Sequence, residues 1–215
     1  MIPAIVLAAG TSSRMGRPKA LLPIGASGET FLTRILRSLR EGGIQRAFVV
    51  IGGDAGAVRA TLPGNDDFLT VVENRNYEQG QLSSFLVGLS AAEEEDEVDG
   101  VMVTLVDLPL IAAATVTAVL EEHRRSPGAP IIRPRRGTRH GHPAIFHRSL
   151  FDELRSTDPS MGAKPVVHAH AADEVNVDVA DDGAFTDIDT PEDYERYIRP
   201  TLSQATETQR HGEEA

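Results

Sequence analysis

The chain has 215 residues, enough to bury one sizeable hydrophobic core. Its formal net charge of -11 argues against a general nucleic-acid-binding surface, because a phosphate backbone requires clustered cations. The chain contains no cysteine, which excludes disulfides, thiolate metal sites and cysteine nucleophiles. No apolar run approaches the length of a membrane helix, and no charged segment precedes the apolar N-terminal stretch. We therefore expect neither a membrane anchor nor a signal peptide, and a cytoplasmic location.

The hydrophobic pattern predicts strands that alternate with helices. Strands are expected at 4–9, 47–51, 69–72, 100–106, 130–133, 144–146 and 175–179. Helices are expected at 29–41, 55–62, 80–94, 115–125, 150–155, 163–171 and 191–199. This order favours a three-layer α/β/α sandwich around a mostly parallel mixed sheet, as a single domain over 1–200. The tail 201–215 is polar and is expected to be frayed or disordered.

The loop after the first strand combines Gly10 and Gly16 with the cations Arg14, Arg17 and Lys19. Glycine lets backbone N–H groups approach an anion, and Arg and Lys supply the countercharge that a triphosphate needs. The loop lacks the Gly-Lys-Ser/Thr ending of the Walker motif, and its prolines argue against the helix that follows a dinucleotide fingerprint. The alternative is an ordinary strand-to-helix loop with surface cations.

Asp107 ends the buried strand 100–106 in the run Asp107-Leu108-Pro109. A carboxylate at the carboxyl end of a central strand faces the crevice that the first loop also borders. A triphosphate-bound Mg²⁺ requires such a hard oxygen ligand. The alternative is a turn or N-cap aspartate.

Asp187 and Asp189 flank Ile188 in a segment that we expect to be the end of a strand. Thr190 and Pro191 directly after it have the pattern of a helix N-cap followed by its first position. This helix start explains Thr190 and Pro191 but not the two aspartates.

The segment 133–143 is basic and punctuated by glycine, and we expect it to be a long loop. Long loops between regular elements are usually functional or mobile. A small ligand that carries a phosphate group would find donors there in Arg139 and His142. For Arg135 and Arg136 a solvated hairpin tip is an equally good interpretation.

The N-terminal run Leu7-Ala8-Ala9-Gly10-x-Ser12-x-Arg14-Met15-Gly16-x-Pro18-Lys19 resembles the signature of the MobA-like nucleotidyltransferase superfamily. Its Ala-Ala-Gly form and its Met-Gly-x-Pro-Lys ending are most similar to the molybdenum cofactor cytidylyltransferases. The resemblance continues more weakly to about Arg199. It implies a Rossmann-like, GT-A-like fold with a late antiparallel strand.

The resemblance also implies a role for each motif. Arg14 and Lys19 would hold the phosphates, and Asp107 and Asp189 would be catalytic and bind Mg²⁺, although Val106 replaces the glycine that often precedes the first aspartate. Ser84, whose simplest role is to cap the helix that it opens, would contact the base. The full set of expected nucleotide contacts is Leu7, Ala8, Ala9, Gly10, Ser12, Gly52, Gly80 and Ser84, and the expected acceptor contacts are Arg139 and His142.

The implied reaction is attack of an acceptor phosphate on the α-phosphorus of a nucleoside triphosphate, with release of pyrophosphate. The guanylyl-transferring relatives tend to have glycine where this chain has Ala9, whose methyl group favours a pyrimidine, so CTP is the first choice. The first acceptor would be the molybdopterin form of the molybdenum cofactor, with a molybdoenzyme as a partner. Two alternatives stay open: transfer to a sugar or polyol phosphate, and a binding module that delivers nucleotide or cofactor without catalysis.

Overall fold

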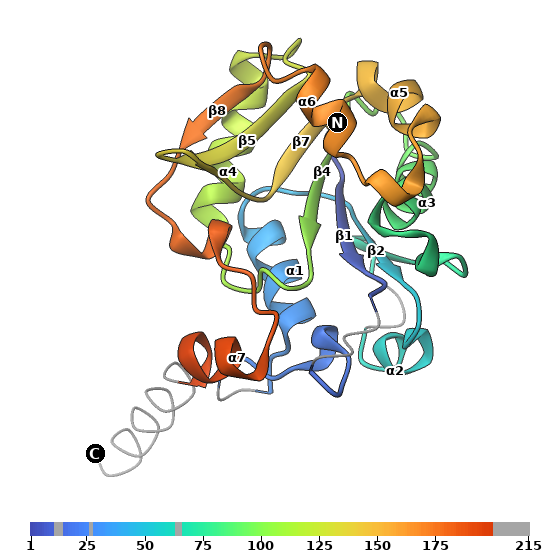
Figure 1. Ribbon diagram of the computed structural model, residues 1–215, viewed down its shortest axis with the longest axis vertical. Coiled ribbons are helices and arrows are strands. Elements are labelled where there is room, and N and C mark those ends of the chain that lie inside the picture. The colour runs from blue at the N-terminus through green and yellow to red at the C-terminus, as the bar shows by residue number, and fades with distance from the viewer. Residues whose placement is uncertain (11–14, 26–27, 63–65, 200–215) are drawn as a thin grey trace.

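The computed structural model describes residues 1–10, 15–25, 28–62 and 66–199, which form a mixed sheet with helices on both faces (Figure 1). The expected sandwich is therefore confirmed. The polar tail 201–215 lies outside the described residues. Among the helices of the described ranges, none has the length and apolar character that a membrane span requires.

The strands are β1 Ala4–Ala8, β2 Ala47–Ile51, β3 Leu69–Glu73, β4 Gly100–Leu105, β5 Ile131–Arg136, β6 Arg139–His140, β7 Ala144–His147 and β8 Val175–Asp178. The α-helices are α1 Phe31–Glu41, α2 Ala55–Arg59, α3 Gln81–Ala92, α4 Ala113–Arg125, α5 Phe151–Ser156, α6 Lys164–Ala169 and α7 Pro191–Tyr197. The 3₁₀ helices are η1 Lys19–Leu21, η2 Tyr77–Gln79, η3 Arg148–Leu150, η4 Pro159–Met161 and η5 Asp182–Phe185.

The order of the strands places the end of β1 at a switch point. The sheet runs β3-β2-β1-β4-β7-β5-β6, and β8 pairs with β5. Strands β3, β2, β1 and β4 are parallel, whereas β7 is antiparallel to both of its neighbours. From β1 the chain proceeds to β2 on one side and later returns to β4 on the other. A crevice for ligands forms outside the carboxyl ends of strands at such a point.

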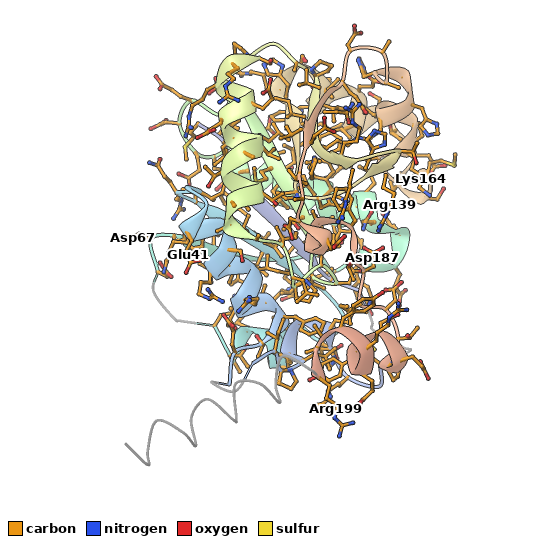
Figure 2. The ribbon with its side chains drawn as sticks, turned by 90° about the vertical axis from the view of Figure 1, so that its left-hand side faces the viewer. Glu41, Asp67, Arg139, Lys164, Asp187 and Arg199 are labelled. Carbon is orange, nitrogen blue, oxygen red and sulfur yellow. The ribbon has the colours of Figure 1, made fainter. Side chains whose placement is uncertain are left out.

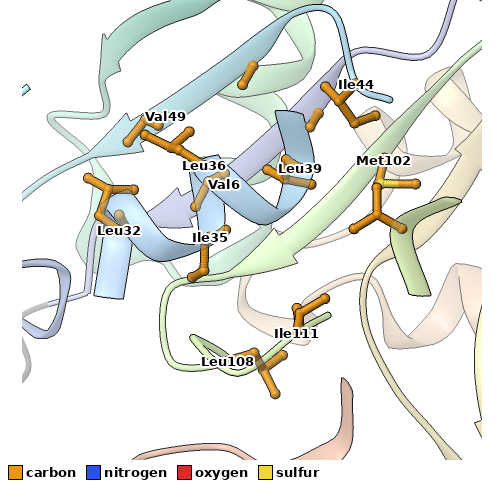
Figure 3. Packing of buried hydrophobic residues seen from close by; sticks show 14 of the residues in the cluster. Val6, Leu32, Ile35, Leu36, Leu39, Ile44, Val49, Met102, Leu108 and Ile111 are labelled. Atoms are coloured by element: carbon orange, nitrogen blue, oxygen red, sulfur yellow. The ribbon is translucent and has the colours of Figure 1, made fainter. Parts of the chain in front are cut away.

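The two layers of helices cover opposite faces of this sheet. One face packs against α1 and α4, and Figure 3 shows Leu32, Ile35 and Leu36 of α1 over the strand residues Val6 and Val49. The other face packs against α3, α5 and α6. All five residues of β1 and of β2 are buried, as expected of strands covered on both sides.

Two expectations for the second half of the chain are corrected by the structure. The segment 133–143 is not one long loop: β5 continues to Arg136 and pairs with β6 in a hairpin, in which Gly137 has the positive φ of 61° that the tight turn needs. Asp187–Asp189 are not the end of a strand, because they follow η5 in irregular backbone. The expected helix start after them is confirmed, since the Thr190 side chain and Asp193 form a reciprocal capping box.

Helix α3 approaches β1 and β2 closely enough that residue 88 must be glycine. A Cβ at Gly88 would lie 2.6 Å from Cγ2 of Ile5 and 2.8 Å from Cγ2 of Val50, both of which are fully buried. We expect Gly88→Ala to lower the free energy of unfolding by about 1–3 kcal/mol through overpacking. Gly56→Ala in α2, where a Cβ meets nothing within 4 Å, should be neutral or stabilising by up to about 1 kcal/mol. Urea unfolding of both variants checks this, and equal effects would contradict it.

Candidate functional site

Three charged side chains that are far apart in the sequence meet at the carboxyl edge of the sheet. The Lys19 side chain is buried, with 8% of the residue exposed. Its Nζ donates a hydrogen bond to Oδ1 of Asp189 and lies 3.5 Å from Oδ2 of Asp107. The structure therefore brings together one cation and two acids of the expected catalytic set. A fourth expected member, Arg14, lies outside the described residues, as does Ser12.

Each of these side chains is placed by its own local structure. Lys19 opens η1, whose turn is closed by the hydrogen bond from Leu22 N to Lys19 O. Asp107 follows β4, whose end is held by β1 through the bond from Val106 N to Leu7 O at 3.1 Å. The C-terminal segment is attached directly to that loop, because Ile188 N donates to Asp107 O at 2.8 Å. Asp189 therefore reaches the site because a backbone hydrogen bond fixes its neighbour beside Asp107.

The site is acidic, and one of its buried carboxylate oxygens lacks a hydrogen-bond partner. Oδ1 of Asp107 is buried and has no hydrogen-bond partner among the described residues. Desolvation raises the pKa of Asp187, and the carboxylates of Asp107 and Asp189 act in the same direction, while Lys19 and Arg139 oppose them. Asp187 was given no role in the sequence interpretation; its two-residue spacing from Asp189 was the available signal.

These acids do not form a metal cage by themselves. Within the described ranges, no group of three or more His, Asp or Glu side chains is arranged to hold a metal ion. Mg²⁺ at triphosphate sites is commonly held by one or two carboxylates, with phosphate oxygens and water completing the shell. The buried and unpartnered oxygen of Asp107 beside a second acid fits that partial donor set.

The end of β1 and the segments beside it form the expected nucleotide side. Leu7, Ala8 and Ala9 are buried, and Gly10 is exposed where the loop begins. Gly52 follows β2 and lies against this end, since a Cβ on it would be 2.6 Å from Ala9 O and 2.9 Å from Cγ of the Tyr77 ring. No larger residue fits at position 52 without a shift.

Ser84 is held at the start of α3 by a buried asparagine that sequence reasoning did not single out. Nδ2 of Asn74 donates to Oγ of Ser83 at 2.9 Å and to Oγ of Ser84 at 3.0 Å, and Asn74 is 2% exposed. The available signal was a polar residue just after a strand. Gly80 precedes α3 with φ 109°, and a Cβ there would lie 2.9 Å from Pro159 O. Ser84 is itself buried, with 4% of the residue exposed, and its contact with a base stays a prediction.

Arg139 and His142 lie on the other side of the acids. The Arg139 guanidinium donates to Phe185 O and lies 5.4 Å from the centroid of the Phe185 ring. Figure 2 shows Arg139 and Asp187 on the same side of the molecule. Nδ1 of His142 is 3.2 Å from Val103 O, so this nitrogen carries the proton that it donates to the carbonyl. Burial lowers the pKa of His142, although this hydrogen bond and Asp107 oppose the shift.

His142 also borders a small cavity on the face of the sheet that α3 covers. The cavity has a volume of about 50 Å³. Its lining is mostly apolar and comes from β1, α3, β4, β7 and the start of α6: Leu7, Gln81, Leu82, Phe85, Val103, Leu105, His142, Phe146 and Ala163. His142 thus lies between this apolar cavity and the acidic residues at the carboxyl edge of the sheet.

Comparison with known proteins identifies the class to which this fold and site belong. The profile of the MobA-like NTP transferase domain matches residues 4–175. The chain therefore belongs to the MobA-like family of nucleotidyltransferases.

Solved structures of high similarity cover nearly the whole chain. Rv0371c from Mycobacterium tuberculosis H37Rv is 32% identical with a TM-score of 0.75, covering 93% of this chain and 98% of that one. The manganese complex of Rv0371c is 31% identical with a TM-score of 0.70, over 92% of this chain and 98% of that one. These likenesses confirm the Rossmann-like nucleotidyltransferase fold.

Relatives in sequence include proteins with different names. A probable molybdenum cofactor guanylyltransferase from Rhodopirellula baltica is 28% identical over 181 residues, 75% of this chain and 82% of the relative. The bifunctional protein GlmU from Heliobacterium modesticaldum is 33% identical over 126 residues, 57% of this chain. The match spans only 26% of the length of that GlmU protein.

The grouping of Lys19 with the acids predicts a pH-dependent loss of stability when the ammonium is removed. We expect Lys19→Met to lower the free energy of unfolding at pH 7 by about 1–3 kcal/mol, because it leaves partly buried carboxylates facing one another. The loss should shrink as the pH falls toward 4, where the carboxylates of the variant take up protons. Thermal unfolding across this range measures the effect. Arg17→Met, which removes an exposed cation two residues away, is the control, and an equal loss in both variants would contradict the prediction.

Proposed function

We propose that this protein transfers a nucleoside monophosphate, CMP from CTP in the first instance, to a phosphate-bearing acceptor with release of pyrophosphate. The observation that carries the proposal is the meeting of Lys19, Asp107 and Asp189 at the switch point of the sheet. Phosphoryl and nucleotidyl transfer need little covalent chemistry from a protein. They need positioned charges that orient the phosphates and neutralise the charge that develops on them.

Asp107 and Asp189 are the residues that would hold a divalent cation, for which we propose Mg²⁺. The unpartnered Oδ1 of Asp107 supports this assignment, as does the manganese complex of a relative. Such a cation, when bound, neutralises charge on the phosphates and on the leaving pyrophosphate. In this proposal the two acids determine where the triphosphate binds, because its cation must lie within reach of both carboxylates.

Lys19 pairs with Asp107 and Asp189, and its ammonium would serve the phosphates of a bound nucleotide. Lys19 is the first residue of the 3₁₀ helix η1, and its ammonium already lies beside the acids to which the nucleotide is proposed to bind. Arg14 is proposed to assist it. Ala9, Gly52 and Ser84 would border the base, and the tight packing of Gly52 on Ala9 supports a pyrimidine over a purine.

Arg139 and His142 are proposed to face the acceptor. The Arg139 guanidinium is a donor suited to a phosphate monoester. Nε2 of His142, whose Nδ1 proton is given to Val103 O, can accept a hydrogen bond from the acceptor, and donates one only when the imidazole is protonated. The Rhodopirellula relative favours the molybdenum cofactor as the acceptor. Transfer to a sugar or polyol phosphate is the second candidate.

Turnover tests the proposal directly. Incubation with Mg²⁺, each of the four triphosphates and a panel of phosphate acceptors should release pyrophosphate, most rapidly with CTP. We expect Asp107→Asn and Asp189→Asn to lower the rate by about 100-fold or more, because each removes charge that the cation requires. Asp178→Asn, at an exposed carboxylate of β8 that pairs with Arg135, is the control with near-normal rate. Nucleotide binding without pyrophosphate release, unchanged in Asp107→Asn, would instead identify a delivery module.

Nucleotide preference tests the role of the Ala9 methyl group. We expect Ala9→Gly to shift the ratio of kcat/KM for GTP over CTP upward by about 10-fold or more, the scale of one methyl group in a binding pocket. Kinetics with both triphosphates and one fixed acceptor measure the ratio. Ala55→Gly, at the start of α2, is the matched loss of a methyl group outside the proposed pocket. An unchanged ratio in Ala9→Gly would assign the discrimination to other residues.

A further inference from the structure

The segment 181–189 leads to Asp189 and packs against the loop that carries Asp107. Its first residue, Asp181, has no part in the functional assignments above. Oδ2 of Asp181 accepts hydrogen bonds from Ala112 N at 2.9 Å and from Thr115 Oγ1 at 2.7 Å. Oδ1 accepts from Gly183 N at 2.9 Å. Ala112 is the N-cap residue of α4 and has no capping side chain. Asp181 therefore caps α4 from a distant part of the chain, where a carboxylate is favoured by the helix dipole.

The same segment touches the Asp107 loop at two further points. Gly183 is buried against the carbonyl of Leu110, and a Cβ at residue 183 would overlap that oxygen. Five residues later, Ile188 N donates to Asp107 O. The loop that carries Asp107 and the segment that leads to Asp189 are thus joined side by side, from the first turn of α4 to the acids themselves.

The opposite side of η5 faces the residues assigned to the acceptor. His142 N donates to Ala184 O at 3.0 Å, and Arg139 donates to Phe185 O. Gly141 packs so closely on Ala184 that a Cβ at residue 141 would overlap its carbonyl. The 3₁₀ helix η5 therefore lies between the loop that carries Asp107 and the turn that carries His142, and its backbone atoms contact both.

We propose that Asp181 is a positioning residue for the reaction: by capping α4 and fixing η5 against the Asp107 loop, it sets the placement of Asp189 relative to Asp107. Asp181 acts on these carboxylates through η5 and the backbone of Ile188. The inference rests on the proposed function, in which the two acids hold a divalent cation. Residues that orient metal ligands typically change metal affinity or activity by about 10- to 100-fold when they are replaced.

The test compares three variants of the full chain. Asp181→Ala removes all three hydrogen bonds, and Asp181→Asn keeps the shape while it replaces one accepting oxygen with a donor. Asp66→Asn is the matched control, because Asp66 also accepts from a backbone N–H and pairs with a cation, Arg40, but precedes β3 at the amino edge of the sheet.

Mn²⁺ is titrated into each protein in the presence of CTP and without acceptor, and its binding is followed by electron paramagnetic resonance. Hydrogen exchange of the Ile188 amide is measured in parallel. We expect both Asp181 variants to bind Mn²⁺ about 10- to 100-fold more weakly than the parent chain and to exchange Ile188 faster. Asp66→Asn should lower the melting temperature and leave both readouts unchanged.

Two results would overturn the positioning role. The first is that Asp181→Asn binds Mn²⁺ as tightly as the parent chain although its Ile188 amide exchanges faster. The second is that the Ile188 amide of the Asp181 variants exchanges at the parental rate. If Asp181→Ala does not fold, Asp181→Asn alone decides between these outcomes. A parent chain that transfers no nucleotide to any acceptor contradicts the proposed function, while the Mn²⁺ titration still decides the role of Asp181.

Discussion

The arrangement of the site depends on one buried ammonium placed between carboxylates from distant segments. A cluster of acids in partly desolvated surroundings is unfavourable unless a cation compensates it. Lys19 supplies that charge, and its side chain reaches both Asp107 and Asp189. Burial of any one of these charges is therefore favourable only when three segments come together: the first loop, the end of β4 and the C-terminal segment.

The same charge balance suits a ligand that carries both signs. A triphosphate with its divalent cation offers phosphate oxygens to the ammonium and a cation to the carboxylates. Each protein group can then exchange one ionic partner for another without being left unpaired in the crevice, which is the costly alternative. Desolvation, together with the nearby carboxylates of Asp107 and Asp189, raises the pKa of Asp187, as expected where acids gather in a partly buried site.

The sequence predicted the regular half of the molecule well because burial alone determines it. Strands β1 and β2 are apolar on both faces and could be located from their unbroken apolar runs. Arg135 and Arg136 were less certain because an exposed strand and a loop have the same polar composition; pairing with β6 settles the matter. The role of Asn74 and the contacts of Asp181 depend on tertiary neighbours, which no local pattern encodes.

In the proposed reaction Asp107 serves both the nucleotide and the acceptor, and the position of β4 fits that role. On one side β4 pairs with β1, in the parallel half of the sheet that borders the proposed nucleotide side. On the other it pairs with antiparallel β7, which follows the turn that carries His142. Asp107 therefore stands at the boundary between the two halves, within reach of groups held by either. Since β7 runs opposite to β4, the amino end of β7 lies at the same edge of the sheet as the carboxyl end of β4. The antiparallel direction of β7 therefore brings the turn that carries His142 to the acids.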